Sequence, residues 1–326
     1  MNSWRHVDPY STQFLLVVKD EHAGQSLIDF YCGKFGYKPR EFWTDLIAKG
    51  NSNVNHQTQG PDYILEVGDE IRTRRDDVQE PDVRCDYKVL LDEDGIFVVN
   101  KPAPLPAHPS GRYFKNSLLS ILKEDYPDRK FHTIHRLDKW TTGVLVLATD
   151  PDAARCLHKQ VEAQAMKKSY GVLAAGHFPK QRFQIDAAIG RVKGAHRGTG
   201  KGIEEAKESL TEFEIIKSTK PIVIPDLIRD PGRDDTVEID ARQIHLLKAT
   251  PVTGRTNQIR VHVQAAGGHV LNDPLYSPLQ KAEHELIPYL GLHCRSMGFK
   301  DVGGKDITIH ADWPEHFLEF FPEIEF

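Results

Sequence analysis

The sequence predicts an α+β fold: one large mixed, mainly antiparallel sheet with flanking helices, plus a small N-terminal α/β module. Three observations lead to this prediction. Apolar stripes at helical spacing mark the first 75 residues, short alternating apolar runs typical of strands follow from Val89, and amphipathic helical segments lie between those runs. With 39% hydrophobic and 27% charged residues among 326, the chain has enough apolar material for a packed core.

Three segments are distinguished along the chain. Residues 1–75 form the small module, in which apolar stripes at 27–35 and 42–47 predict two short helices, followed by strand-like pieces. Residues 76–88 are rich in acids and are interpreted as a linker. Residues 89–326 form the larger domain.

The larger domain begins with two apolar runs around a DEDG turn, which predicts a β-hairpin over 89–101. A loop follows at 101–111, where four prolines in eleven residues restrict the backbone. Helices are predicted from residue 117 and from Pro151, which suits a first helical turn. Further strands are predicted at residues 169–176, 209–216, 237–250 and 307–312.

Two segments interrupt this pattern of strands. Residues 190–202 are basic and glycine-rich, and we interpret them as a flexible loop that could become ordered on phosphates. Residues 218–235 contain three prolines and are interpreted as a surface excursion, to which no chemistry is assigned.

The charge of the chain is unevenly distributed. The net charge is −5, yet residues 312–326 carry −5 and residues 62–94 carry −7, which leaves +7 for the rest of the chain. A basic working surface with acidic margins is compatible with a polyanionic partner such as RNA, although scattered solvated charge is an equal alternative.

Cysteine usage and apolar runs indicate the compartment. The four cysteines are widely spaced with no CxxC pair, a pattern that predicts no disulfide framework and fits a reducing environment. The early apolar run at 14–18 is too short for a signal peptide or a membrane span. We therefore expect a cytoplasmic protein that does not associate with membranes.

Asp138 is the first candidate catalytic residue. It lies in HRLDKWTTGVLVLA, close to His135, Arg136 and Lys139, and immediately before an apolar run that predicts a buried strand. Neighbouring cations favour an ionised carboxylate, and a buried strand would hold that carboxylate rigidly. The alternative is an aspartate that only stabilises a turn.

The segment 254–268, GRTNQIRVHVQAAGG, predicts a helix, with Arg255 at its entry and Arg260 five residues further on. These two arginines would lie about 140° apart around the axis, so only one can reach a buried acid. We expect Arg255 to make that contact, with a solvated helix face as the alternative. Tyr170, on a predicted strand after two lysines, could stack on a base or fill a half-buried sheet.

The sequence shows no pattern for a metal or a nucleotide cofactor. Six histidines are notable, but none occurs in an HxH or HExxH pattern or near a cysteine at ligand spacing. Neither a Walker loop nor a GxGxxG motif is present. We expect no metal and no cofactor.

Four motifs, in order, resemble those of the RluA-type pseudouridine synthases. They are FVVNKPAPLPAHPSGRY, HRLDKWTTGVLVLA, KKSYGVLAAG and GRTNQIRVHVQAAGGHVLNDPLY, followed by LHCRSMGF. The resemblance covers about residues 88–314, and residues 23–75 are more loosely similar to the alpha-L RNA-binding module that often precedes this domain.

The resemblance implies roles for individual residues. Asp138 would be the essential carboxylate, Tyr170 would stack under the target uracil and is a proposed proton acceptor, and Arg255 would pair with Asp138. Arg136 would help to fill the space left by the extruded base. The residues expected to bind RNA are Arg136, His135, Lys101, His108, Arg112, Lys168 and Arg260.

The function that the resemblance implies is isomerisation of specific uridines in structured ribosomal or transfer RNA to pseudouridine, without a cofactor. The carboxylate could attack C1′, stabilise its positive charge or take a proton from C2′. Departures from the family pattern at Trp140, Thr142 and Asn257 leave room for a non-catalytic RNA-binding or ribosome-assembly protein on the same fold. A hydrolase using Asp138 and His135 is a third interpretation. RNA is the expected partner, with no obligate protein partner and a monomeric state.

Overall fold

The computed structural model describes residues 3–36, 38–178, 180–194, 196–223 and 241–326. It contains two compact units. The smaller is His6–Pro81, and the larger combines the chain up to Arg5 with Asp82–Phe326. Strand β1 (Trp4–Arg5) belongs to the larger unit because it pairs with β5 (Val83–Arg84).

The structure differs from the expected linker at residues 76–88. Strand β4 (Glu70–Val78) occupies its beginning and β5 lies within it, so the units divide between Pro81 and Asp82. Val78 and Val83 are buried on either side of that division. Of the acids in this stretch, Asp76 and Asp77 are exposed on β4, and Asp86, just after β5, pairs with Arg84. The high charge content of residues 76–88 therefore led to the prediction of a linker where strands are present.

The smaller unit has three strands and two α-helices among its described residues. Strands β2 (Tyr10–Val17), β4 and β3 (Ser52–Val54) form an antiparallel sheet, with a short 3-10 turn (Asp20–His22) between β2 and the helices. Helices α1 (Leu27–Lys34) and α2 (Arg40–Ala48) confirm the two predicted stripes.

A buried aromatic pair holds the smaller unit together. The ring of Trp43 stacks on that of Tyr31 with centroids 4.9 Å apart. The Tyr31 hydroxyl hydrogen bonds with Ser52 and Thr73, so the polar end of this buried ring has partners on β3 and β4. Ser26 caps α1 by accepting the backbone N–H of Asp29.

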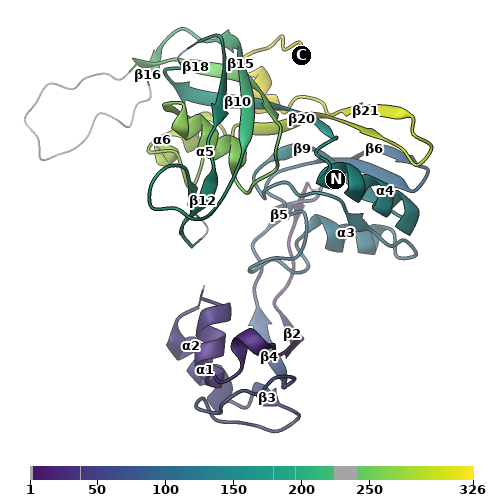
Figure 1. Ribbon diagram of the computed structural model, residues 1–326, viewed down its shortest axis with the longest axis vertical. Helices are drawn as coiled ribbons and strands as arrows, with labels where there is room; N and C mark the ends of the chain where they lie inside the picture. The colour runs from purple at the N-terminus through teal and green to yellow at the C-terminus, as the bar shows by residue number, and fades with distance from the viewer. Residues whose placement is uncertain (1–2, 37, 179, 195, 224–240) are drawn as a thin grey trace, which may run out of the picture. The chain divides into compact units, whose positions relative to one another are not determined.

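The larger unit is built on one mixed sheet, which confirms the predicted fold class (Figure 1). Along the sheet lie β11 (Arg182–Asp186), β15 (Leu210–Ser218), β18 (Ile244–Pro251), β10 (Lys167–Gly176), β20 (Leu292–Lys300), β9 (Thr142–Ala148), β7 (Ile96–Lys101) and β6 (Lys88–Glu93). Strands β8 (His132–Thr133), β19 (Gly268–Val270) and β21 (Asp306–His310) add to it at the sides. Among the described pairings of this sheet, β20 with β9 is parallel and the others are antiparallel.

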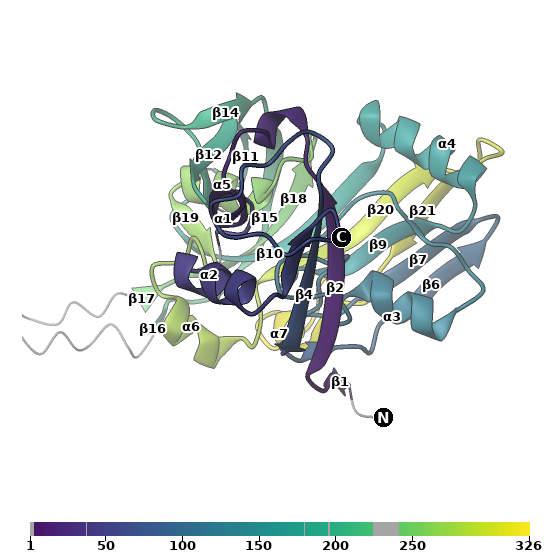
Figure 2. The same cartoon turned by 90° about the horizontal axis from the view of Figure 1, so that it is seen from below.

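Helices cover both faces of this sheet (Figure 2). Helices α3 (Leu118–Asp125), α4 (Pro151–Glu162) and α5 (Gln258–Ala265) contribute apolar side chains to the main core. On the other face, α6 (Gln280–Leu286) and α7 (Glu315–Leu318) pack over Leu173 and Leu246. Asp150 caps α4 and Pro151 opens it, as the sequence predicts.

One glycine fixes the centre of the sheet where β9 meets β20. Gly143 has a φ of +108°, and a Cβ at this position would collide with the backbone carbonyl of Cys294. Only glycine allows the two strands this approach. The turn that precedes β9, which carries Asp138, is therefore anchored directly beside the middle of the sheet.

The expectation of a flexible loop at 190–202 is wrong. This segment contributes to a small three-stranded sheet of β12 (Ile189–Lys193), β13 (His196–Gly198) and β14 (Glu204–Lys207). Gly190 serves close strand approach, because a Cβ at this position would collide with the Glu204 carbonyl, whereas Gly194, Gly200 and Gly202 adopt positive φ angles in turns. Glycine content therefore misled the prediction.

The segment expected to be a surface excursion, residues 218–235, is described only in part. Strand β15 runs to Ser218, and the two-residue strand β16 (Ile222–Val223) pairs with β17 (Ala241–Arg242). Residues 224–235 of that prediction lie outside the described residues. No helix in the described part of the chain is long and apolar enough to cross a membrane.

Candidate active site

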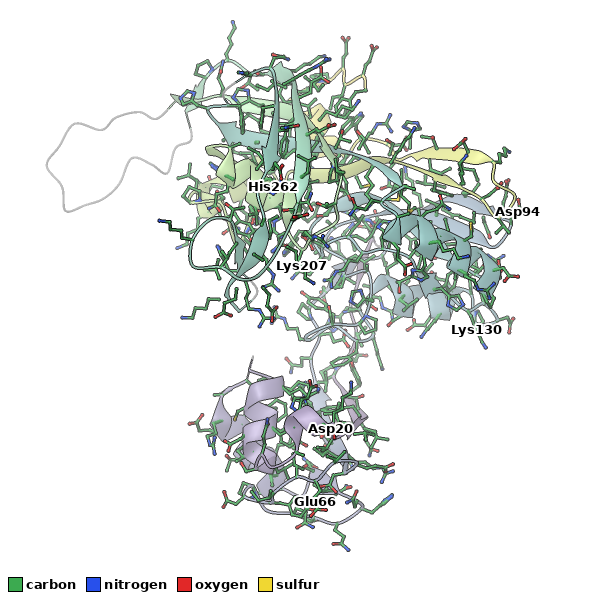
Figure 3. All side chains as sticks on the ribbon, in the orientation of Figure 1. Asp20, Glu66, Asp94, Lys130, Lys207 and His262 are labelled. Carbon is green, nitrogen blue, oxygen red and sulfur yellow. The ribbon has the colours of Figure 1, made fainter. Side chains whose placement is uncertain are left out.

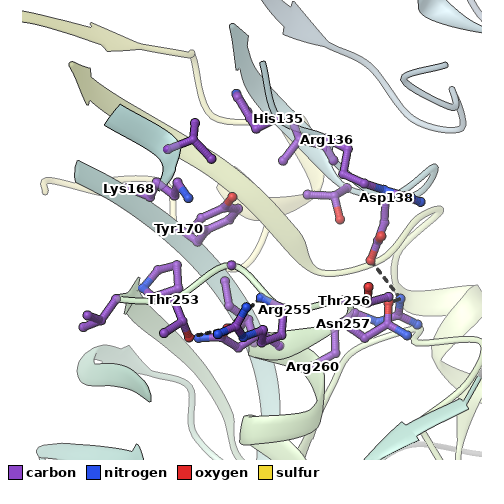
Figure 4. A pocket seen from close by; sticks show the side chains of 18 of the residues that line it. His135, Arg136, Asp138, Lys168, Tyr170, Thr253, Arg255, Thr256, Asn257 and Arg260 are labelled. Carbon is purple, nitrogen blue, oxygen red and sulfur yellow. Dashed lines mark hydrogen bonds and ion pairs between the residues drawn. The ribbon is translucent and has the colours of Figure 1, made fainter. Parts of the chain in front are cut away.

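A cavity of about 430 Å³ opens in the larger unit beside the turn that carries Asp138 (Figure 4). Its walls are the turn at 134–141, the start of β10, the end of α4 and the segment 251–260 that leads into α5. Asp138, Tyr170 and Arg255, the three residues expected to be catalytic, all line this cavity. Segments far apart in the sequence are therefore brought to one site.

The Asp138 carboxylate lies at one end of the cavity and is held by Arg260. The Arg260 Nη1 donates a hydrogen bond of 3.1 Å to Oδ2 of Asp138, whose side chain is 28% exposed. The same guanidinium donates two bonds, of 2.7 and 2.6 Å, to the fully buried carboxylate of Asp273. One cation thus lies between two carboxylates, and only Asp138 remains open to the cavity.

This arrangement keeps Arg260 charged. Burial opposes the charge, but hydrogen bonds and Coulombic attraction to Asp273, together with Asp138, raise the pKa of the Arg260 guanidinium above its usual value. The Asn257 side-chain oxygen accepts a further bond of 3.0 Å from Arg260 Nη1. A fixed, permanently charged donor therefore orients the Asp138 carboxylate.

The expectation that Arg255 pairs with Asp138 is wrong, because Arg260 makes that contact. The helix begins at Gln258, and Asn257 before it adopts a left-handed conformation with a φ of 59°. The estimate of 140° assumed one continuous helix, whereas a turn separates the two arginines. Arg255 lines the cavity and its Nε donates 3.0 Å to the carbonyl of Glu208.

Two residues expected to bind RNA are buried and engaged elsewhere. The Arg260 side chain is only 5% exposed, and its donors bond Asp138, Asp273 and Asn257. Lys101 is fully buried. The placement of Lys101 corrects that expectation, because its side chain cannot contact a polyanion at the surface. Arg260 lines the cavity, so its contact with RNA stays a prediction.

Lys101 instead connects the proline loop to the turn that carries Asp138. Its Nζ donates to the backbone carbonyls of Pro102, Leu105 and Lys139, at 2.9, 2.8 and 3.4 Å. Burial lowers the pKa of Lys101 to about 7, opposed by attraction to Asp138. The residue following Asp138 is thereby fastened to a segment more than thirty positions earlier in the chain.

The cations adjacent to Asp138 in sequence do not surround its carboxylate in space. The Lys139 Nζ donates 3.0 Å to the Tyr113 hydroxyl. Burial lowers the pKa of His135 to about 3, and its Nε2 accepts the backbone N–H of Val146 at 3.0 Å, so this ring is neutral at neutral pH. Arg136 is exposed and lines the cavity. The cation that matters for Asp138 comes from α5.

Tyr170 forms part of the cavity wall on β10. It is largely buried, and its hydroxyl shares a hydrogen bond with the thiol of Cys294. Burial, with the nearby Cys294 and Asp138, raises the pKa of Tyr170 well above 10. The side chain is therefore a neutral phenol at neutral pH, which suits a stacking surface better than a phenolate base.

The remaining residues expected to bind RNA lie differently. Lys168 lines the cavity two residues before Tyr170. Arg112 is exposed on the proline loop and His108 is partly buried, and neither lines the cavity. Burial lowers the pKa of His108, and the nearby positive charge of Arg136 lowers it further, so His108 and Arg136 interact electrostatically. RNA contact by His108 and Arg112 stays a prediction.

The sequence analysis missed two supporting residues, Asp273 and Gln258. The Gln258 side-chain oxygen accepts from Thr253 Oγ1 and the Arg255 backbone N–H, at 2.7 and 2.9 Å, which shapes the turn before α5. Asp273 lies in the quoted motif ending VLNDPLY, where an acid within a mostly apolar stretch could have indicated a buried partner for an arginine.

The described residues contain no cluster of three or more histidine, cysteine or carboxylate groups that could hold a metal ion. What the site provides is an oriented carboxylate, a neutral aromatic wall and several cations around a nucleotide-sized cavity. Such a carboxylate can act as a nucleophile, a base or an electrostatic stabiliser.

Comparison with known proteins identifies the family. The sequence profile described as RNA pseudouridylate synthase matches residues 95–265, just over half of the chain. The chain belongs to the RNA pseudouridylate synthase family. The match spans the proline loop, the Asp138 turn, Tyr170 and α5, so the residues that line the cavity, apart from Leu292, fall inside it.

Individual relatives agree with this family membership. RNA pseudouridine synthase 7 of Arabidopsis thaliana is 31% identical over 275 residues, covering 83% of this chain but 65% of that protein, less than two thirds of its length. Ribosomal large subunit pseudouridine synthase C of Haemophilus influenzae is 27% identical over 307 residues, covering 88% of this chain and 87% of that protein.

A solved structure supports the fold. Human RNA Pseudouridylate Synthase Domain Containing 1 superimposes with a TM-score of 0.56 at 22% identity, over 70% of this chain and 84% of that chain. The shared architecture is that of a pseudouridine synthase domain, in agreement with the mixed sheet seen here.

Proposed function

We propose that this protein converts specific uridines in structured RNA to pseudouridine, using Asp138 as the catalytic carboxylate and no cofactor. The observation that carries this proposal is the Asp138 carboxylate itself, held by Arg260 at 3.1 Å and open to a cavity walled by Tyr170. Family membership supplies the reaction class.

The reaction rearranges atoms already present in the RNA. The bond from uracil N1 to ribose C1′ breaks, the base turns, C5 bonds to C1′, the C5 proton leaves and N1 gains a proton. Asp138 could attack C1′, stabilise its positive charge or take a proton from C2′, and each route needs the carboxylate close to the sugar. Its orientation by a charged, buried donor suits all three.

The size and chemistry of the cavity support a flipped-out nucleotide. Its volume of about 430 Å³ falls within the range of roughly 300–1,000 Å³ typical of small-molecule sites. A uridine must leave its helical stack before its glycosidic bond can react. The neutral ring of Tyr170 offers a surface for the base, opposite the carboxylate that would face the sugar.

A basic recess supports RNA as the substrate. A hollow of about 250 Å³ adjoins the cavity, shares residues 254–256 with it, and is lined by the small sheet β12–β13–β14. Its side chains include Arg191, Arg197 and Lys207, the last of which is labelled in Figure 3. Glu205, 3.6 Å from Arg191, is the acid among them. Excess positive charge next to the cavity favours phosphate contact.

Two of the three departures that motivated the non-catalytic alternative lie outside the cavity. Trp140 stacks against Tyr289 at 6.4 Å, and Thr142 hydrogen bonds with Nδ1 of His293 at 2.8 Å. Neither side chain lines the cavity, and Asn257, which does, supports Arg260. These departures from the family pattern therefore leave the carboxylate and its partner in place.

We further propose ribosomal or transfer RNA as the substrate, a monomer without obligate protein partners, and a cytoplasmic location. The four cysteines are free thiols, which supports a reducing compartment such as the cytoplasm.

The proposed function is tested with RNA labelled with tritium at uracil C5. Incubation with the protein, with no cofactor added, should release tritium to solvent, and Asp138→Ala should abolish the release. Normal release by that variant would refute the assigned role. If the wild-type protein binds structured RNA with a strong salt dependence but forms no pseudouridine in total RNA, the non-catalytic alternative is correct.

A further inference from the structure

Lys168 is a cation inside the cavity that the proposed mechanism has not yet used. It lies on β10, opposite Met297 of β20, on the same side of the strand as Tyr170. Its neighbour Lys167 points to the opposite side and is exposed. Strand alternation thus sends one of two consecutive lysines into the cavity and the other to solvent.

The Lys168 ammonium has no hydrogen bond or ion pair with any residue in the described part of the chain. Burial lowers its pKa, opposed by attraction to Cys294. A partly desolvated ammonium without an acceptor is unfavourable for the folded protein unless something else fills that role. An acceptor supplied by a bound substrate would satisfy it.

The local backbone leaves space for this ammonium. The Lys168 Nζ would lie 3.7 Å from a Cβ added to Gly254, so it sits against the turn that leads to α5, where no side chain is present. Arg255 follows in the same turn, with its Nε engaged by the Glu208 carbonyl. Lys168 is therefore the more available of these two cations.

The cavity is consequently polarised. Figure 4 shows Asp138 at one end and Lys168 with Tyr170 at the other. Arg260 is shared between Asp138 and Asp273, so one net negative charge remains at the Asp138 end. A substrate spanning the cavity would place its sugar at the carboxylate and the far edge of its base at the ammonium.

We propose that the Lys168 ammonium contacts a carbonyl oxygen of the flipped uracil and stabilises the negative charge that the base acquires when its glycosidic bond breaks. This inference rests on the proposed function. The electron pair of the N1–C1′ bond passes to the base, where it is shared by N1 and the two carbonyl oxygens. Lys168 donates a hydrogen bond throughout and transfers no proton.

This role is catalytic because the charge on uracil develops only as the bond breaks. A donor aimed at such charge in a water-poor site typically contributes about 10²–10³-fold to the rate. Contact with a phosphate, in contrast, would be equally strong before and during the reaction and would affect affinity alone. The two roles therefore predict different kinetics.

The test compares Lys168→Met, Lys168→Arg and the matched control Lys167→Met in single-turnover reactions. Lys168→Met should lower the rate at saturating RNA by about 10²-fold or more, with little change in affinity. Lys168→Arg should recover part of the rate, and Lys167→Met should match the wild-type protein. Thermal melting of each variant identifies any that fail to fold. If Lys168→Met does not fold, the comparison is made between Lys168→Arg and the wild-type protein.

A pH profile adds a readout that a purely structural role would not alter. The protonated ammonium is the active form, so the wild-type rate should fall as pH rises through the lowered pKa of Lys168. Arginine at this position stays charged, which should move the fall to higher pH. The other ionisable groups that face or line this part of the cavity are His135, Asp138, Glu162, Tyr170, Cys294 and Arg255.

The outcomes separate this inference from the proposed function. If the wild-type protein forms no pseudouridine, the function itself fails. If it is active but Lys168→Met keeps its saturated rate, or loses only affinity, Lys168 does not stabilise the base and the inference is overturned. An unchanged pH profile in Lys168→Arg would also overturn it.

Discussion

The guanidinium of Arg260 bridges Asp138 and Asp273. It donates one hydrogen bond of 3.1 Å to the first carboxylate and two hydrogen bonds, of 2.6 and 2.7 Å, to the second. Asp273 is fully buried, so it fixes the arginine, and the arginine fixes the Asp138 carboxylate, which faces the cavity. The position of the reactive group thus depends on a residue 135 positions away in the sequence.

The first prediction concerns this bridge. Arg260→Lys retains a positive charge but cannot make two parallel bonds to Asp273 while reaching Asp138. We expect its single-turnover rate to fall by at least about 10²-fold. Arg255→Lys is the matched variant, and it should change RNA affinity more than rate because Arg255 does not touch Asp138. Equal rate losses in both variants would contradict this assignment.

The second prediction concerns acid stability. His135 has a folded-state pKa of about 3, below the ordinary 6.5, so the unfolded chain binds its proton first as the pH falls. The contribution to the free energy of unfolding is complete above pH 6.5 and is lost progressively down to about pH 3.

Urea unfolding at pH 7.5 and pH 5 measures this effect. His135→Gln keeps an acceptor for Val146 but cannot be protonated, so its stability should fall less between the two pH values than that of the wild-type protein. His158→Gln, at an exposed position on α4, should behave like the wild type. An identical pH response in all three proteins would show that His135 is not the group responsible.

The third prediction concerns the basic recess. Replacing Arg197 and Lys207 together by alanine should weaken RNA binding and lower the slope of log affinity against log salt by about one unit for each lost phosphate contact. Replacement of the exposed Lys130 and Lys123, which lie outside the recess, serves as the control. A slope that is the same in both double variants would remove the recess from the RNA-binding surface.

The fourth prediction concerns the anchoring of the turn that carries Asp138. Gly143→Ala would drive a Cβ into the Cys294 carbonyl, and we expect a loss of about 2 kcal/mol or more in the free energy of unfolding. Gly111→Ala is the control, because Gly111 also has a positive φ but an added Cβ meets no atom within 4 Å. Chemical unfolding of both variants separates the collision from backbone strain. Equal losses would argue against the collision.

Much of the fold could be predicted from the sequence because the patterns that indicate its helices and strands are local. Pro151 and its preceding aspartate mark a helix start, and the apolar runs around DEDG form the hairpin of β6 and β7. The strands within residues 76–88 and the small sheet at 189–207 were missed. A high charge content occurs in exposed strands as well as in linkers, and glycine occurs where strands pack closely as well as in flexible loops.

The members of the site could be named from the sequence more easily than their contacts. Asp138 and Tyr170 do meet in one cavity. The choice of Arg255 over Arg260 failed because it depended on where α5 begins, and the left-handed Asn257 that sets this start is a tertiary feature. The burial of Lys101 was likewise hidden, because its acceptors are backbone carbonyls of three separate positions.

The most direct measurement is the nucleoside content of RNA after incubation with the wild-type protein or with Asp138→Asn, which preserves shape and removes the negative charge. Binding of both proteins to the same RNA is measured in parallel. We predict that both bind with similar affinity but that only the wild-type protein produces pseudouridine. Pseudouridine formed at a comparable rate by Asp138→Asn would contradict the account.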